Sequence, residues 1–214
     1  MNGADIQATV SLLTELIWKR DEEGVATLIS GLPPADTPLV VSRLDASDRC
    51  ELFELLDPEE AAGVIANMKD LGPHILLSKL APETAARILH ELPSNLETDL
   101  IAAMKPAAAE KILGLLSDRE TDDVKALARY DSDVAGGLMV TEILSYSEST
   151  TVGEVVDDLR RNSKVYARFN IQYIYVTRDE DLLVGVLRIR DLLLSDAETN
   201  LGQLILEDPV TVDH

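Results

Sequence analysis

Carboxylate side chains are the groups in this sequence with the greatest capacity for chemistry. The 214 residues include 39 Asp and Glu against 19 Lys and Arg, which leaves a formal net charge of −20. So much like charge raises the energy of a compact fold, and bound cations relieve it. The excess therefore predicts cation binding, although simple solubility is the alternative, because acidic soluble proteins are common.

Other kinds of chemistry find less support in the sequence. Nucleic acid is a poor partner for this chain because phosphate contacts need clustered Lys and Arg, and anionic membrane surfaces are disfavoured for the same reason. His74 and His90 have no Cys or second His at metal-ligand spacing, so we expect structural roles for both. The sequence contains no Gly-rich phosphate loop, nucleophile elbow or HExxH motif, so nothing in it supports an enzyme.

Cysteine usage and hydropathy bear on the compartment. Cys50 is the only cysteine, which excludes an internal disulfide and fits a reducing compartment. No run of about 18 apolar residues occurs, so we expect no segment to insert into a membrane. The N-terminus lacks the basic and apolar regions of a signal peptide. We therefore expect a cytosolic chain.

Adjacent apolar pairs recur every 12 residues through the first half of the chain. Most pairs are followed three residues later by another large apolar residue, and this i, i+3, i+4 spacing marks one face of a helix. The pairs are Leu16-Ile17, Leu28-Ile29, Val40-Val41, Leu52-Phe53, Val64-Ile65, Leu76-Leu77, Ile88-Leu89, Leu100-Ile101 and Ile112-Leu113. The repeat predicts short helices that bury their apolar faces by stacking.

Proline recurs with twice that period, at Pro34, Pro58, Pro82 and Pro106. Proline suits the first helical position, where no N–H bond is lost. Asp57, followed by Glu60 at the third helical position, predicts an N-cap with a capping box. The repeating unit is thus a pair of short helices, which predicts a superhelical array that serves as a contact surface or as a plain scaffold.

The pattern changes after Arg129. Residues 131–139 include Gly136-Gly137, and paired glycines oppose the continuation of a helix, so this segment predicts a flexible joint. Thr151 and Glu154 then form a capping-box pattern that opens a helix to about Arg161. The other predicted elements are strands at 143–147 and 171–177, a polar turn at 178–181, a second hairpin arm at 182–189, a helix at 191–195 and a turn at 201–205.

These patterns predict an α plus α/β fold in three parts. A helical-repeat domain at 1–130 is followed by the joint at 131–141 and by a small β-α-β-β-α domain at 142–214. The tail Asp208-Pro209-Val210-Thr211-Val212 looks like a strand of a further unit. We therefore expect the sequence to stop part-way through a larger architecture.

Several motifs resemble the MgtE family of magnesium transporters along essentially the whole chain. The most specific is Ala126-Leu127-Ala128-Arg129-Tyr130 followed by Ala135-Gly136-Gly137-Leu138-Met139, which is similar to the junction between the N domain and the first CBS domain. Pro34-Ala35-Asp36 and the Leu-x-Pro-Glu-x-Ala-Ala units at Leu56 and Leu80 resemble the N domain. Tyr173-Ile174-Tyr175-Val176 and the segment from Gly185 to Leu192 resemble the CBS domain.

The resemblance implies a homodimeric Mg²⁺ channel on the cytoplasmic face of the inner membrane. High cytosolic Mg²⁺ would bind between the cytosolic domains, draw them together and close the pore. Dimerisation would run through the CBS domains, and the pore domain would be the partner of this region. The second CBS domain, the connecting helix and the pore lie outside this sequence, so we do not expect this fragment to transport ions itself.

CBS domains that bind adenosine nucleotides such as ATP usually have a Gly, then a Ser or Thr three residues on, then an Asp. Gly185 and Asp191 match this pattern, whereas Arg188 stands at the hydroxyl position. Arginine contacts phosphate in its own right, but the usual cleft also needs the second CBS domain. The resemblance therefore makes Gly185, Arg188 and Asp191 candidate nucleotide ligands.

The resemblance also implies acids of the N domain that face the CBS domain, on the helix around residue 97. Mg²⁺ keeps several waters and takes one or two carboxylates directly, so no dense motif is needed. The alternative for Glu97 and Asp99 is a solvated helix face. The candidate Mg²⁺ ligands are Asn95, Glu97, Asp99, Asp131, Asp133, Asp196 and Glu198.

Both halves of the chain are acidic. Residues 1–129 hold 23 acidic and 12 basic side chains, and residues 130–214 hold 16 and 7, so the net charges are −11 and −9. We hypothesise that the two bodies separate without metal and approach when Mg²⁺ screens them. Two alternatives stay open. One is a CBS module that senses adenosine nucleotides, and the other is an interaction scaffold, because the helical repeats also resemble the middle domain of the flagellar switch protein.

Overall fold

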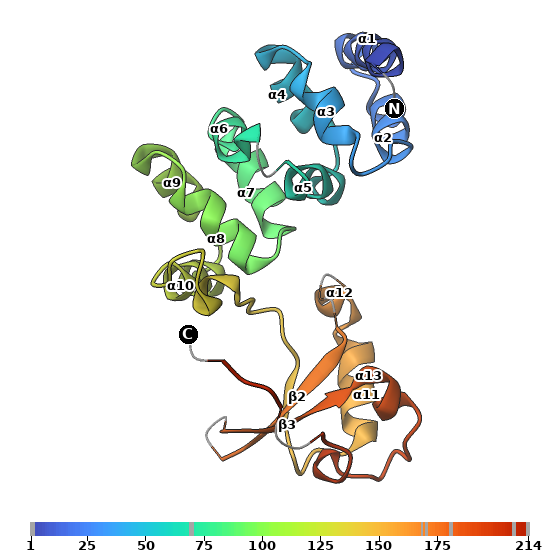
Figure 1. Cartoon of the computed structure of the whole chain (residues 1–214), viewed down its shortest axis with the longest axis vertical. Coiled ribbons are helices and arrows are strands. Elements are labelled where there is room, and N and C mark those ends of the chain that lie inside the picture. The colour runs from blue at the N-terminus through green and yellow to red at the C-terminus, as the bar shows by residue number, and fades with distance from the viewer. Residues whose placement is uncertain are drawn as a thin grey trace. The chain divides into compact units, whose positions relative to one another are not determined.

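The chain divides into two compact units, residues 1–133 and 134–214 (Figure 1). The structure is a computed structural model that describes residues 3–68, 71–167, 169, 171–179, 182–206 and 209–212. The division between the units falls inside the expected joint. Among the described residues, no helix is both long enough and apolar enough to cross a membrane.

In the part that the structure describes, the first unit consists of helices joined by turns. They form the stacked array that the 12-residue repeat predicts. The helices are α1 (Gly3–Lys19), α2 (Glu22–Ser30), α3 (Thr37–Ser42), α4 (Ala46–Leu55), α5 (Pro58–Ala66), α6 (Pro73–Leu77), α7 (Pro82–His90), α8 (Ser94–Ala102), α9 (Pro106–Leu113) and α10 (Asp118–Leu127).

The repeated apolar pairs contribute a large part of the core of this unit. Leu52 and Phe53 are buried, and the same holds at the equivalent pairs Leu76-Leu77 and Ile88-Leu89. Each large apolar side chain removed from water contributes about 1.5–3 kcal/mol. At Leu16-Ile17, Leu28-Ile29 and Ile112-Leu113 one member of the pair is buried and the other is half-buried against it. The pairs thus contribute to one continuous core along the array, as the repeat predicts.

Proline opens the helices at three of the four expected places. Pro58, Pro82 and Pro106 are the first residues of α5, α7 and α9. The expectation fails at Pro34, where residues 34–36 form a turn and α3 begins at Thr37. The capping box predicted at Asp57 is also wrong, because its carboxylate accepts a hydrogen bond from the Glu59 N–H at 3.1 Å instead.

The paired glycines of the joint are helical. Ala135–Leu138 forms a short 3-10 helix, η2, in which Gly136 is buried. The N–H of Gly137 donates to the Val134 carbonyl at 3.1 Å, and the N–H of Met139 donates to the Gly136 carbonyl at 3.3 Å. A tight 3-10 turn needs only i to i+3 bonds, so glycine does not prevent it. The role of residues 131–141 as a hinge remains a prediction.

The second unit has a three-stranded sheet in the order β1-β2-β3. β1 pairs with β2 in parallel, and β2 pairs with β3 in antiparallel orientation. The helices α11 and α13 lie beside the sheet (Figure 1). Their buried residues Val152, Val155 and Leu192 share one core with the strands. The elements are β1 (Ser145–Ser147), α11 (Val152–Arg161), α12 (Ser163–Tyr166), β2 (Tyr173–Arg178), β3 (Leu182–Arg188), α13 (Ile189–Leu193) and η3 (Leu201–Gln203).

This order confirms the predicted β-α-β-β-α domain. The capping box is present, since the Thr151 hydroxyl accepts from the Glu154 N–H and the Glu154 carboxylate accepts from the Thr151 N–H at 2.8 Å. The last helix begins at Ile189 rather than at Asp191. Residues 209–212 form no strand, and Val210 is fully exposed. Glu180 and Asp181 of the predicted turn, and Asp208 of the tail, lie outside the described residues.

Candidate functional site

The candidates on α8 do not share one face of the helix. Glu97 is buried, at 5% exposure, whereas Asp99 is exposed and Asn95 is half-buried. Residues two apart on a helix point in different directions, while residues four apart are neighbours. Asn95 and Asp99 therefore form one pair, and Glu97 is separate from them.

The repeat explains why Glu97 is buried. Ala61 and Ala85 take the equivalent position in neighbouring units, and both are fully buried. The interpretation of a solvated helix face is therefore right for Asp99 and wrong for Glu97. A buried carboxylate is costly unless it has polar partners, and Glu97 takes part in a polar interaction. We assign Glu97 to the interior of the helical unit.

The remaining metal candidates are exposed, and each pair lies within its own unit. Asp131 and Asp133 precede η2 at the end of the first unit. Asp196 and Glu198 follow α13 in the second unit, where the Asp196 carbonyl accepts from the Thr199 N–H at 3.0 Å. Within the described ranges, no group of three or more Asp, Glu, His and Cys side chains lies close enough to hold a metal ion. A Mg²⁺ that keeps its waters needs only one or two of these carboxylates.

Gly185 has a structural reason to be glycine. It is buried in β3, and a Cβ atom there would lie 2.8 Å from the Leu206 carbonyl oxygen and 2.9 Å from the Ile205 Cβ. Glycine thus permits the backbone of residues 205–206 to approach the strand, where Val186 and Leu206 pair. This close packing is a second explanation for the match to the nucleotide motif.

Arg188 and Asp191 lie one turn apart at the start of α13. Arg188 is the exposed N-cap residue, and Asp191 is a half-buried acid of the first turn. The Oδ1 atom of Asp191 lies 3.9 Å from the Nε atom of Arg190. The structure therefore leaves the guanidinium of Arg188 accessible to an anion, whereas Gly185 is covered.

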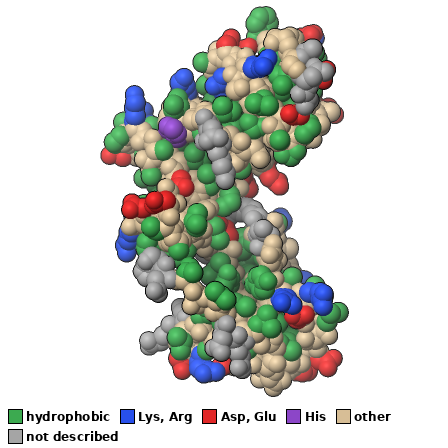
Figure 2. All heavy atoms as spheres, in the orientation of Figure 1, with side chains coloured by type: hydrophobic (Ala, Val, Ile, Leu, Met, Phe, Trp, Pro, Cys, Tyr) green, Lys and Arg blue, Asp and Glu red, His purple; other side chains and the backbone are tan. Residues whose placement is uncertain are grey.

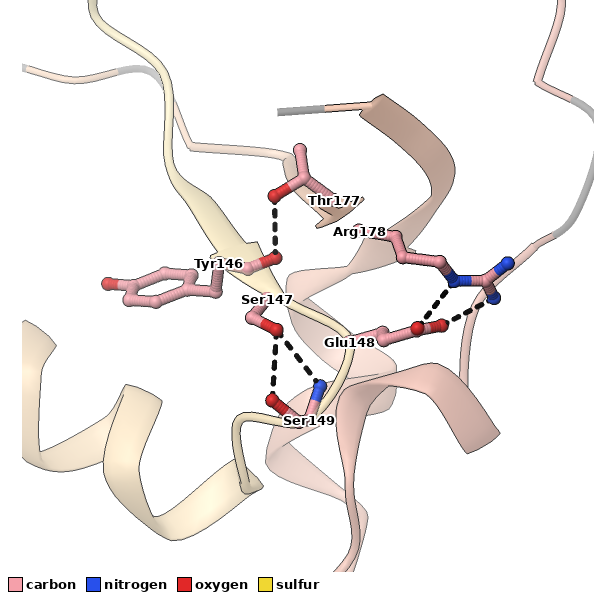
Figure 3. A network of polar contacts seen from close by, with 6 residues as sticks. All are labelled: Tyr146, Ser147, Glu148, Ser149, Thr177 and Arg178. Atoms are coloured by element: carbon pink, nitrogen blue, oxygen red, sulfur yellow. Dashed lines mark hydrogen bonds and ion pairs between the residues drawn. The ribbon is translucent and has the colours of Figure 1, made fainter. Parts of the chain in front are cut away.

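A bidentate ion pair fixes the loop after β1 to the end of β2 (Figure 3). The Nε atom of Arg178 lies 2.5 Å from Oε1 of Glu148, and its Nη2 atom lies 2.7 Å from Oε2. Arg178 thereby holds the pKa of Glu148 below its usual range. The two residues are 30 positions apart, so only the pairing of Ser147 with Thr177 in the sheet brings them together.

Asp158 is the centre of a second polar network. Its Oδ2 atom accepts hydrogen bonds from the hydroxyls of Tyr146 at 2.7 Å and Tyr166 at 2.9 Å, and its Oδ1 accepts from the Asn162 amide at 2.7 Å. The Tyr146 bond, followed by the others, lowers the pKa of Asp158. Burial, and then the same carboxylate, raise the pKa of Tyr146. The network joins β1, α11 and α12, so we assign Asp158 a structural role.

His90 has a structural role, as the sequence predicts. Its Nδ1 atom contacts the carboxylate of Glu120, which joins α7 to α10. Glu120 also caps α10 by accepting hydrogen bonds from the N–H and hydroxyl of Ser117. Burial opposes ionisation of this carboxyl, but the bonds from Ser117 and His90 hold its pKa below its usual range.

Comparison with known proteins decides the family. A profile described as the MgtE intracellular N domain matches residues 32–133, and one described as the CBS domain matches residues 133–198. The magnesium transporter MgtE of Thermus thermophilus is 31% identical over 210 residues, which are 90% of this chain and 43% of that protein. The chain belongs to the MgtE family.

A second MgtE protein, from Enterococcus faecalis, is 28% identical over 217 residues, covering 98% of this chain and 46% of that protein. The chain thus spans less than half the length of these curated relatives. The crystal structure of the soluble part of a magnesium transporter matches 96% of this chain and 80% of that chain, with a TM-score of 0.79 and 26% identity. The cytosolic domain of the Mg²⁺ channel MgtE in complex with ATP matches 95% and 82%, with a TM-score of 0.82 and 30% identity.

Proposed function

We propose that this chain is the magnesium-responsive regulatory region of an MgtE-type transporter and has no enzymatic activity. The observation that carries the proposal is the agreement in sequence and fold with the cytosolic domain of an Mg²⁺ channel over 95% of the chain. Its relatives from Thermus thermophilus and Enterococcus faecalis are named magnesium transporters. In the whole protein, this region would lie on the cytoplasmic side of the membrane and act on a pore domain.

The charge of the chain supports the mechanism. The halves on either side of residue 130 have net charges of −11 and −9, so their mutual repulsion is relieved when a divalent ion lies between them. Five candidate carboxylates are exposed to solvent, and we propose that such an ion binds among them: Asp99, Asp131, Asp133, Asp196 and Glu198. Asn95 can supply an amide oxygen beside Asp99, whereas Glu97 is excluded by its burial.

At low Mg²⁺ concentration, the two units would lie apart. At high Mg²⁺ concentration, the bound ion would draw them together. In the complete transporter, the closed arrangement would close the pore, and the CBS domains would hold two copies of the protein together. This mechanism requires that the response be specific for divalent ions. General screening by salt alone would leave the chain unable to distinguish Mg²⁺ from K⁺.

Small-angle scattering during a Mg²⁺ titration in the millimolar range tests the proposal. We expect the radius of gyration to fall and Gly136-Gly137 to become protected from limited proteolysis. Ca²⁺ should substitute in part, and KCl at matched ionic strength should have a much smaller effect. An equal response to KCl and MgCl₂ would reject magnesium sensing by this region.

Nucleotide binding is a second candidate function, favoured by the related structure that contains ATP. Arg188 is exposed at the start of α13 and presents a guanidinium that binds phosphate. An ATP titration by calorimetry tests this candidate, with Arg188→Ala compared with Arg43→Ala, which removes an exposed arginine at the end of α3. Loss of heat in both variants alike, or in neither, would remove Arg188 from the site.

A further inference from the structure

A basic cavity lies between α6, α7 and α9 of the helical unit. It has a volume of about 700 Å³, within the range of about 300–1,000 Å³ that is usual for small-molecule sites. Lys79, Lys105, Lys111 and His74 line it, and none of its lining residues in the described part of the chain is Asp or Glu. The chain has seven lysines, and three of the seven line this one cavity.

The lysines of this cavity form no ion pair with any carboxylate that the structure describes. Among the described residues, Lys19 and Lys125 form ion pairs with Glu15 and Asp122, but Lys79, Lys105 and Lys111 form none. In a chain with twice as many acids as bases, such a cluster is a local reversal of charge. Figure 2 shows the colours of Lys, Arg and His side chains at the edge of the helical unit, with acidic side chains close by. An anion would meet attraction here and repulsion over most of the surface.

The floor of the cavity is apolar. Leu77, Leu80 and Ile112 belong to the buried core, and Ala108 is half-buried beside them. Ile75 adds an apolar side chain that is 54% exposed. An apolar floor with cationic groups around it suits a ligand that has both an apolar body and a charged end.

The 24-residue repeat permits a comparison of the start of α9, at this cavity, with the start of α7. At the start of α7, the carboxylate of Glu54 accepts hydrogen bonds from the Ala81 N–H at 3.2 Å and the Thr84 hydroxyl at 2.7 Å. One repeat later, the equivalents of Glu54, Ala81 and Thr84 are Ser78, Lys105 and Ala108, and all three line the cavity.

Because of these replacements, no residue in the described ranges gives α9 the carboxylate that Glu54 gives α7. The helix α9 has neither a side-chain cap nor an acidic residue in its first turn. At the start of α7, the anion is the carboxylate of Glu54. At the start of α9, the positive end of the helix and the lysines favour an anion that is not part of the chain.

We infer that this cavity binds a small phosphorylated organic anion. The phosphate would lie among Lys79, Lys105 and Lys111, because three ammonium groups match a doubly charged phosphate monoester better than a single carboxylate. The apolar part of the ligand would lie on Leu77, Ala108 and Ile112. This site is independent of the proposed magnesium response, since it lies within one unit and uses no carboxylate.

Isothermal titration with 1-naphthyl phosphate tests the inference on the full chain. Lys105→Ala/Lys111→Ala is compared with Lys125→Ala/Lys164→Ala, which changes the net charge by the same amount at exposed positions elsewhere. We expect the first variant to weaken binding at least tenfold and the second to change it less than twofold. Equal weakening in both variants, or no binding to the unmodified chain, overturns the site.

A second variant keeps the test independent of the lysines. Ala108→Leu fills the floor, so it should weaken 1-naphthyl phosphate at least fivefold while leaving inorganic phosphate unchanged; circular dichroism checks that each variant folds. If Ala108→Leu weakens the binding of 1-naphthyl phosphate and of inorganic phosphate equally, the site does not have separate apolar and phosphate-binding parts. Vesicles of phosphatidylglycerol are titrated in parallel, because lipid headgroups also present phosphate. Binding to vesicles but not to 1-naphthyl phosphate would overturn the assignment of a soluble ligand.

Discussion

Glu54 on α4 accepts a hydrogen bond from the Thr84 hydroxyl on α7, 30 residues along the chain, at 2.7 Å. The same carboxylate accepts the Ala81 N–H at 3.2 Å, so it closes the start of α7 from a neighbouring helix. Thr84 is buried at 7% exposure. The contact therefore satisfies a buried hydroxyl and fixes the stacking of one repeat on the next.

Glu54→Ala should destabilise the helical unit by about 1–3 kcal/mol, because it leaves the buried Thr84 hydroxyl without its acceptor. Urea unfolding followed by far-UV circular dichroism measures the change. Glu110→Ala is the control, since this exposed residue of α9 should tolerate alanine within about 0.5 kcal/mol. Equal stability of the two variants would show that the Glu54 contact contributes nothing.

Gly185→Ala and Gly63→Ala should have opposite effects. A Cβ at Gly185 would lie 2.8 Å from the Leu206 carbonyl, whereas a Cβ at Gly63 in α5 meets nothing within 4 Å. We expect Gly185→Ala to destabilise the second unit by about 1–3 kcal/mol through overpacking. Gly63→Ala should stabilise the first unit by about 0.5–1 kcal/mol, because alanine favours helix.

Hydrogen exchange measured by mass spectrometry separates these two effects. Amides of β3 and of residues 205–206 should exchange faster in Gly185→Ala, and amides of α5 should exchange more slowly in Gly63→Ala. Unchanged exchange in β3 would contradict the close approach of residues 205–206. Nucleotide titrations of Gly185→Ala should therefore be interpreted only after its folding has been measured.

Tyr146→Phe should make the second unit less stable near neutral pH and should lose that effect in acid. The Tyr146 hydrogen bond lowers the pKa of Asp158 below its ordinary 3.8. A lowered pKa in the fold contributes stability above the ordinary pKa, and this contribution disappears as the pH falls through the lowered value. The difference in the free energy of unfolding between the unmodified chain and Tyr146→Phe should thus be largest at about pH 7 and should shrink below pH 3.8.

Urea midpoints of the second unit at several pH values check this expectation. Tyr173→Phe serves as the control because Tyr173 is exposed on β2 of the same sheet and makes no hydrogen bond to Asp158. A difference for Tyr146→Phe that stays constant with pH would mean that packing of the ring, and not the Asp158 bond, is lost.

Much of the fold follows from periodic features of the sequence. The pairs at 12-residue spacing lie in the core or pack against it, and Pro58, Pro82 and Pro106 open helices, because each feature acts within one or two turns. The predictions are wrong where a short-range sequence pattern is compatible with two local structures. Gly136-Gly137 permits a 3-10 turn as well as a loop, and Ile189 suits the end of a strand as well as the start of α13.

The candidate sites were harder to predict because they depend on stacking. Glu97 occupies a position that is alanine in neighbouring repeats, and this pattern predicts that it is buried. The general preference of Glu for the surface predicts the opposite, and it is wrong here. Lys79, Lys105 and Lys111 are spread over 33 positions and meet only when α9 packs beside α6 and α7. Glu148 and Arg178 likewise meet only through the register of β1 and β2.

Asp131→Asn/Asp133→Asn should weaken the proposed magnesium response more than an equal loss of charge elsewhere. Both carboxylates are exposed, and they are the last acids of the first unit, directly before the second unit in the chain. The matched control is Glu22→Gln/Glu23→Gln, which removes two acids from the first turn of α2. We expect the Mg²⁺ concentration at half-maximal compaction, measured by scattering, to rise roughly threefold or more in the first variant and to stay nearly constant in the second. An equal rise in both variants would mean that total charge, and not a site at residues 131 and 133, sets the response.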